Sequence, residues 1–225
     1  MARLTLETFA EQVAQALGPR LVTLLLYGSA ARGEQPHGAA MNTLLVTDGD
    51  EEGGADPDLF DRLAGPVRAW TAARHPAPLI LTAREWRESA DAFPIEYQDI
   101  RDAHRILAGR DPWEGITVQR EHVRRQLEHE LMGKLVHLRQ AYAARWNQPK
   151  RLAAVVLETR AGFLTMLRAV LRLAGRTPPA LPEALVREAG ALIGFAPDGL
   201  TDPVAHLNAV TRTAEYVNRM ERTPS

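Results

Sequence analysis

The sequence predicts an α+β protein, in which a small domain with a mixed sheet is followed by an antiparallel helical bundle. Two short apolar runs, Leu21–Tyr27 and Asn42–Thr47, have the length of buried strands and are bounded by turn residues. Segments with helical periodicity lie before and between the later strands. After Gly109-Arg-Asp-Pro112 the pattern changes to long helical segments, so we place the boundary between a first domain of residues 1–114 and a second of residues 115–225.

Each element has its own signal. The first helix carries Phe9, Val13 and Leu17 on one face and ends at Gly18-Pro19, and the last begins at Asp202-Pro203, an N-cap followed by a first-turn proline. In the first domain we expect helices over 6–17, 56–74 and 83–90, strands over 21–27, 42–47 and 77–82, and a fourth extended segment over 95–100 that could continue to 107. In the second domain we expect helices over 118–146, 150–174, 182–193 and 202–220.

Composition excludes several classes of function. The chain of 225 residues has 45% hydrophobic and 24% charged residues, as a globular protein does, and its net charge of −1 gives no signal for nucleic acid or a membrane surface. Without cysteine it has no disulfide, thiolate nucleophile or cysteine-ligated zinc. It shows no membrane-spanning run and no secretory pattern, so we expect a cytoplasmic protein. Only Lys134 and Lys150 are lysines.

A Gly-Ser turn after the first apolar run carries the functional signal. The segment reads Leu25-Leu-Tyr-Gly28-Ser29-Ala-Ala-Arg32-Gly-Glu34, and the following strand contains Leu44-Leu45-Val46. This pattern resembles the signature of the polymerase-β-type nucleotidyltransferases, in a bacterial branch with an altered active site. Gly28 would let a phosphate approach the backbone, while Ser29 would offer a hydroxyl at a helix N-terminus. The resemblance implies that Gly28, Ser29, Arg32 and Thr43 contact a nucleotide or phosphate. The alternative is a tight strand-to-helix turn with a serine cap.

The sequence departs from that family where magnesium should bind. Active members begin the next strand with Asp-x-Asp, and both carboxylates hold magnesium ions. Aligning Leu44-Leu45-Val46 with the family places Met41 and Thr43 at these two positions. A thioether and a neutral hydroxyl are poor magnesium ligands, so we expect Mg²⁺ only if the protein is active with a rearranged site. The acidic loop at 48–54 follows the opposite end of the strand and is expected to be a solvated turn.

Other polar residues have competing interpretations. Glu96, with Asp99 as second choice, is the candidate for the third carboxylate of the family, or a surface charge on an edge strand. His104 is a candidate ligand or base, or a member of a surface hydrogen-bond network. Arg124 and His129 superficially fit the spacing of HEPN-type ribonucleases, although the neighbouring charges look like ordinary exposed helix pairs. Arg160, within an apolar helix, needs a partner, a cavity, or a stem that packs while its head reaches water.

Three functions are compatible with these observations. The first is a catalytically degenerate nucleotidyltransferase-fold protein, a pseudoenzyme that binds a nucleotide or phosphate between its two domains. Its role would be binding or regulation, with a protein as a further possible partner. The second is an active nucleotidyltransferase that transfers a nucleoside monophosphate to a hydroxyl of a small molecule or a protein. The third is a toxin–antitoxin or RNA-processing component whose helical half does the work. The loss of both aspartates favours the first.

Overall fold

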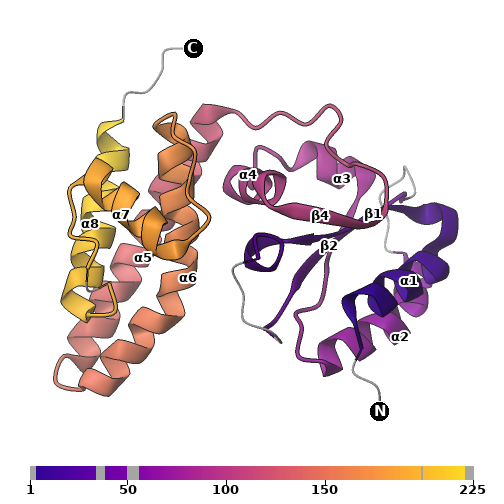
Figure 1. The fold of residues 1–225 in the computed structure, drawn as a ribbon, viewed down its shortest axis with the longest axis horizontal. Helices are drawn as coiled ribbons and strands as arrows, with labels where there is room; N and C mark the ends of the chain where they lie inside the picture. Colours follow the sequence, from indigo (N-terminus) through magenta and orange to yellow (C-terminus); the bar gives the residue numbers. More distant parts are fainter. Residues whose placement is uncertain (1–3, 34–38, 50–55, 199, 221–225) are drawn as a thin grey trace. The chain divides into compact units, whose positions relative to one another are not determined.

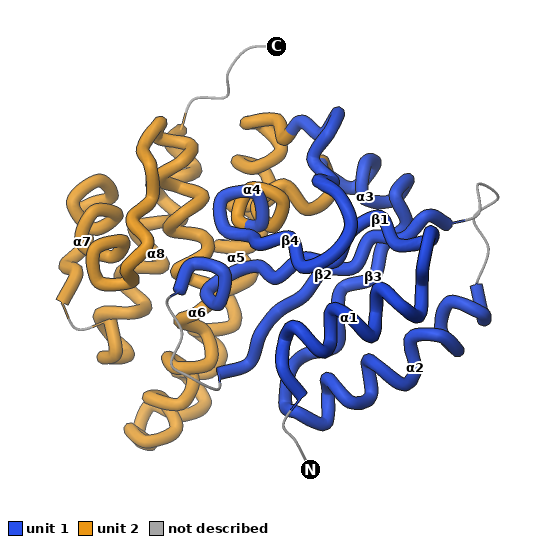
Figure 2. Tube along the Cα trace, turned by 45° about the vertical axis from the view of Figure 1, so that its right-hand side comes forward, with its two compact units in different colours: residues 1–90, 100–117 blue, residues 91–99, 118–225 orange. Residues whose placement is uncertain are grey.

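A computed structural model of the chain describes residues 4–33, 39–49, 56–198 and 200–220 (Figure 1). The chain divides into two compact units, one formed by residues 1–90 with 100–117 and the other by residues 91–99 with 118–225 (Figure 2). Residues 91–99 therefore belong with the helical unit, although they precede the expected boundary by about twenty positions. None of the helices in the described ranges is long and apolar enough to cross a membrane.

The first unit is built on a four-stranded sheet with the order β3-β2-β1-β4. Its strands are β1 (Leu21–Tyr27), β2 (Asn42–Thr47), β3 (Leu79–Thr82) and β4 (His104–Gly109). The central strand β1 pairs antiparallel with both β2 and β4, while β2 and β3 are parallel. The sheet is therefore mixed, and the predicted placement of the first two strands side by side is confirmed.

Two helices cover one face of this sheet. They are α1 (Leu6–Leu17) and α2 (Pro57–Ala72), which lie side by side in Figures 1 and 2. Phe9 of α1 stacks on Trp70 of α2 with ring centroids 4.3 Å apart, and both rings are fully buried with Leu24, Leu26 and Leu45 of the sheet. Asp56 begins α2 as an N-cap, because its carboxylate accepts the Leu59 N–H at 3.0 Å. The alternating apolar residues of the sheet thus close a core with two amphipathic helices.

The expected extended segment over 95–100 is a helix, α4 (Pro94–Asp102), so this part of the expectation was wrong, whereas its possible continuation to 107 falls in the fourth strand, β4. The first residues of α4 are held by helices of the second unit: Gln126 accepts the Ile95 N–H at 2.9 Å, and Arg172 donates to Asp99 at 3.4 Å. Ile95 and Asp99 are four positions apart and lie on one helical face. The short helix α3 (Ala83–Glu88) lies within the helix predicted over 83–90 and begins with a capping box.

The second unit is helical. It contains α5 (Arg120–Arg145), α6 (Pro149–Leu173), α7 (Pro182–Ile193) and α8 (Pro203–Arg219). The long helices α5 and α6 form an antiparallel hairpin, and α8 packs on both. Asp202 caps α8 by accepting the Ala205 N–H at 2.9 Å. These bounds agree with the predicted helices to within two residues, and the α+β class with a mixed sheet and a helical bundle is confirmed.

A glycine at the end of β4 offers a test of the sheet. Gly109 has φ +86°, and a Cβ atom there would lie 2.3 Å from the Val22 carbonyl oxygen of the neighbouring strand. We expect Gly109→Ala to lower the free energy of unfolding by about 2–5 kcal/mol, because it combines left-handed strain with a backbone clash. The control is Gly65→Ala in α2, where a Cβ meets nothing within 4 Å. That variant should be as stable as the wild type or more stable by up to about 1 kcal/mol in urea denaturation.

Candidate functional site

The Gly28-Ser29 turn follows β1 directly. Gly28 is buried and has φ +76°, and its N–H donates to the Ala103 carbonyl at 3.1 Å. Its own carbonyl accepts the Arg32 N–H at 3.1 Å. Both polar groups of the Gly28 backbone are thus used within the turn, and only glycine adopts this conformation without strain. The backbone here is fixed before any ligand arrives.

The helix expected after this turn is only a 3₁₀ turn, η2, of three residues (Gly28–Ala30). So short an element has little dipole to attract an anion, because the dipole effect sums over aligned peptide groups. Any contact with a phosphate would therefore come mainly from the Ser29 hydroxyl and the Arg32 guanidinium. Both side chains are half-buried and already interact with other groups of the protein.

Thr43 lies in the apolar core. It pairs with Leu26 across the β1–β2 ladder, and directly opposed residues in such a ladder share one face of the sheet. Leu26 and Leu45 both belong to the core that α1 and α2 close, so Thr43 points into the same core. Its residual exposure is 1%, and among the described residues its hydroxyl has no hydrogen-bond partner. A ligand in solution cannot reach this hydroxyl, which speaks against the expected nucleotide contact at Thr43.

Met41 also packs on this core. Its side chain is half-buried against the cluster of α1 and α2, and its N–H donates to His75 Nδ1 at 3.2 Å. His75 stacks on Trp70 with ring centroids 4.0 Å apart, so the imidazole joins the start of β2 to the buried aromatic pair. Met41 and Thr43 thus serve the packing of the first unit. Neither side chain suits magnesium, and neither position resembles a solvated metal site.

The carboxylate candidates lie in the helical unit. Glu96 was expected on an edge strand but lies in the first turn of α4, because Pro94 starts a helix there. Its carboxylate is exposed and accepts from Gln126 Nε2 at 2.8 Å. Asp99 is buried and pairs with Arg172. Across the described ranges, no group of three or more His, Asp or Glu side chains is placed to hold a metal ion. Met41, Thr43, Glu96 and Asp99, as the structure describes them, therefore do not make up a two-magnesium centre.

His104 is part of a hydrogen-bond network. Its Nδ1 lies 2.9 Å from the Ile100 carbonyl oxygen, and its Nε2 accepts from the Trp113 indole N–H at 3.3 Å. Because a carbonyl can only accept, the proton of the neutral ring is assigned to Nδ1. The Arg101 guanidinium lies 4.8 Å from the centroid of the Trp113 ring. Both nitrogens of His104 are thus occupied in holding the segment after β4.

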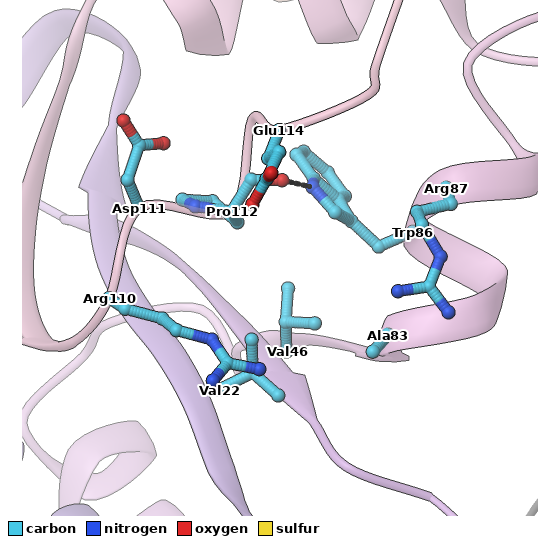
Figure 3. A pocket seen from close by; sticks show the side chains of 9 residues that line it. All are labelled: Val22, Val46, Ala83, Trp86, Arg87, Arg110, Asp111, Pro112 and Glu114. Atoms are coloured by element: carbon cyan, nitrogen blue, oxygen red, sulfur yellow. Dashed lines mark hydrogen bonds between the residues drawn. The ribbon is translucent and has the colours of Figure 1, made fainter.

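A hollow of about 190 Å³ lies at the end of the sheet away from the Gly28-Ser29 turn. Val22 near the start of β1 and Val46 near the end of β2 form its base, and Trp86 forms a wall whose indole N–H donates to the Pro112 carbonyl at 2.9 Å (Figure 3). Arg87 and Arg110 extend into it from opposite sides (Figure 3). It is also lined by Asp111 and Glu114, so its charges balance, and it contains none of the predicted site residues.

In the helical unit, Arg124 is held by its own helix. The guanidinium is nearly buried and pairs with Glu121 at 2.9 Å and with Glu128, and these carboxylates raise its pKa. Such a bidentate, charge-assisted arrangement explains the charge pattern of α5 without a catalytic role. The ribonuclease-like spacing of Arg124 and His129 therefore has a structural explanation.

The sequence did not reveal Lys134 and His206. Lys134, expected on an exposed helix face, is half-buried, and burial lowers its pKa. His206 of α8 is fully buried, and its Nε2 lies 3.1 Å from the Thr159 hydroxyl oxygen. Thr159 donates its proton to the Val155 carbonyl at 2.9 Å, so His206 donates from Nε2, and Nδ1 has no partner among the described residues. Burial, then the charges of Lys134 and Arg160, lower the pKa of His206 to about 4.

The chain was compared with protein-family models, curated proteins and solved structures. A scan of protein-family models and a search of curated proteins find no match. Among solved structures, the chain is similar to spectinomycin adenyltransferase AAD(9) from Enterococcus faecialis, determined with ATP and spectinomycin. The TM-score is 0.46 and the sequence identity 12%, over 94% of this chain and 97% of that chain.

Substitutions at Thr43 test its place in the core. Thr43→Val keeps the shape and removes an unpaired hydroxyl, so the free energy of unfolding should be unchanged or higher by up to about 1 kcal/mol. Thr43→Asp buries a carboxylate without a partner and should lower the free energy of unfolding by roughly 3 kcal/mol or more. Urea denaturation of both variants measures the difference. Equal stability of the two would mean that Thr43 faces solvent.

His206 predicts a loss of stability in mild acid. The pKa of His206 is about 4 in the folded protein and has its ordinary value of 6.5 in the unfolded chain. Between pH 4 and pH 6.5 the imidazole is therefore protonated in the unfolded chain and neutral in the folded protein. The contribution of neutral His206 to the free energy of unfolding is fully present above pH 6.5. It is lost as the pH falls to 4, which lowers the free energy of unfolding by roughly 2–3 kcal/mol. Urea midpoints across this range should fall less steeply for His206→Gln than for the wild type. Parallel curves would contradict the assignment.

Proposed function

We propose that this chain is a nucleotidyltransferase-fold protein that binds a nucleotide or phosphate group at the Gly28–Arg32 turn and does not carry out nucleotidyl transfer. The single observation that most supports a lack of catalysis is the burial of Thr43. The sequence alignment puts Thr43 at the position of a family carboxylate, and its side chain is 1% exposed in an apolar core. Met41, at the other carboxylate position, packs on the same core.

The electrostatic argument supports this loss. Nucleotidyl transfer leaves little covalent chemistry to the protein, so its rate depends on positioning and on charge stabilisation by metal ions. Mg²⁺ gives up its hydration shell reluctantly and needs carboxylates held in a fixed geometry. Met41 and Thr43 provide no such charge, and Glu96 is engaged with Gln126 on a helix of the other unit. An active enzyme would require a different set of metal ligands.

Binding at the turn is supported by its chemistry. Gly28 has the positive φ that allows close approach to the backbone, and Ser29 and Arg32 offer a hydroxyl and a guanidinium within four residues. A planar guanidinium is well suited to phosphate oxygens. The role of such a protein would be recognition or regulation, with a nucleotide or protein partner as the bound species.

The absence of transfer is tested with α-labelled ATP, GTP and CTP, Mg²⁺ and a panel of hydroxyl-bearing acceptors. We expect no labelled product above background, while an active adenyltransferase assayed in parallel gives signal. Labelled product that disappears on Ser29→Ala would establish the active alternative and refute the proposal.

The binding half of the proposal is tested separately by calorimetry without added metal. Ser29→Ala and Arg32→Gln should each weaken nucleotide binding, and loss of the charged Arg32 contact should cost roughly tenfold or more in affinity. Ser89→Ala and Arg87→Gln are the matched controls, because both residues lie at the end of α3, which follows β3 at the end of the sheet opposite the turn. Equal effects of the site and control variants would place the nucleotide elsewhere.

A further inference from the structure

A second hollow lies within the helical unit, between α5 and α6. Its volume is about 260 Å³. The lining residues from α5 recur at helical spacing, and α6 supplies one: His129, Glu130, Gly133, Lys134, His137 and Thr159. Gly133 lies between the two histidines and has no side chain to fill the space, although glycine inside a helix costs up to about 1 kcal/mol. The hollow therefore opens directly onto the amine of Lys134.

Lys134 carries a charge that this unit does not neutralise. Its ammonium donates to the Thr159 carbonyl at a long 3.4 Å, and it forms no ion pair within the described part of the chain. Burial lowers its pKa, and the charge of Glu130, one turn earlier, offsets this only in part. Gly162 of α6 lies close to this amine, because a Cβ atom at that position would be 3.4 Å from the Lys134 nitrogen. The absence of a side chain at Gly162 leaves room for the amine.

Arg160 adds a second positive charge nearby. It follows Thr159 on α6, its Nε is buried, and no described residue accepts a hydrogen bond from that nitrogen or pairs with its guanidinium. The charges of Arg160 and Lys134 both act on the buried His206 and disfavour its protonation. The sequence left three possibilities for Arg160: a partner, a cavity, or a stem that packs while its head reaches water. The described structure provides no carboxylate partner.

The charges of Lys134 and Arg160, both partly buried, thus act on the neutral imidazole of His206. No described carboxylate forms an ion pair with either cation. Burying charge without a partner is costly, and an anion placed between such groups would recover that cost. His129, Glu130 and His137 line the hollow with Lys134, and the charges of Lys134 and Arg160 both act on His206 of α8. Glu130 is the one acidic residue in this set.

We propose that this hollow is a binding site for a small molecule carrying a phosphate or carboxylate group, with Lys134 as its contacting cation and Arg160 as a nearby positive charge. The histidines at the rim supply ring N–H donors to the same ligand. The site is separate from the Gly28–Arg32 turn and belongs to the helical unit, so it does not depend on the proposed function of the first unit.

Pyridoxal 5′-phosphate is a suitable probe, because it carries a phosphate and an aldehyde that reports on nearby amines. The aldehyde carbon forms an imine with the neutral lysine amine and releases one water, and borohydride then delivers hydride to that carbon to give a stable secondary amine. The chain has only two lysine side chains, so peptide mass spectrometry compares Lys134 directly with Lys150 as an internal control. We expect Lys134 to be labelled severalfold more than Lys150 at neutral pH.

The control arms separate anion binding from simple reactivity. Inorganic phosphate or acetate should protect Lys134 and leave Lys150 unchanged, and the anion that protects better identifies the headgroup. Pyridoxal without phosphate should lose most of the selectivity. Arg160→Gln should reduce the labelling of Lys134, and the matched variant Arg151→Gln, exposed on the same helix, should not. Ser29→Ala should also leave it unchanged, which distinguishes this site from the turn.

Equal labelling of the two lysines, or labelling of Lys134 that neither anion reduces, would overturn the proposal. Selective labelling by pyridoxal as strong as that by pyridoxal 5′-phosphate would also overturn it, because the amine would then be reactive without an anion site. All of these outcomes are read on the folded wild-type chain, so none depends on whether a variant folds.

Discussion

The hydrogen-bond register of β1 is the constraint on which the rest of the first unit depends. β1 is bonded on both sides, and its pairing fixes Leu26 opposite Thr43 and Tyr27 opposite both Asn42 and His104. Because side chains alternate along a strand, a shift by one residue would exchange the buried and the opposite faces. The burial of Leu24, Leu26 and Leu45 against α1 and α2 holds this register, and Thr43 must then face the core.

This placement separates the Gly28-Ser29 turn from the two positions at which the resemblance to the nucleotidyltransferases implies metal ligands. The Gly28 turn depends on backbone geometry that β1 and β4 provide, since its N–H is bonded to the Ala103 carbonyl just before β4. A metal site would depend instead on the identity of the side chains, and Met41 and Thr43 pack on the core of α1 and α2. Two carboxylates at these neighbouring positions would repel each other and would be costly to bury without partners.

Elements set by local signals could be predicted from the sequence, and those set by tertiary contacts could not. Continuous apolar runs predicted β1 and β2 with correct bounds, and Asp202-Pro203 marked the start of α8. The segment around Ile95 was mistaken for a strand, because its helical face is completed by Gln126 and Arg172, far away in the sequence. Lys134 looked like a surface charge, since its burial depends on α6, where Gly162 leaves it room. The Gly28-Ser29 turn was found by motif, whereas the burial of Thr43 needed the register.

The most direct test of the central claim is NMR mapping of ATP without metal and, in a separate titration, of Mn²⁺ without ATP. A Mn²⁺ ion broadens the signals of nuclei around it, so it reports whether the protein itself holds a metal at the start of β2. The account predicts shifts of the amide signals of Gly28, Ser29 and Arg32 on addition of metal-free ATP, and no selective broadening at Met41–Thr43 on addition of Mn²⁺ alone. Selective broadening of Met41, Asn42 and Thr43 by Mn²⁺ without ATP would contradict the account, because a metal would then occupy a place that we assign to the core.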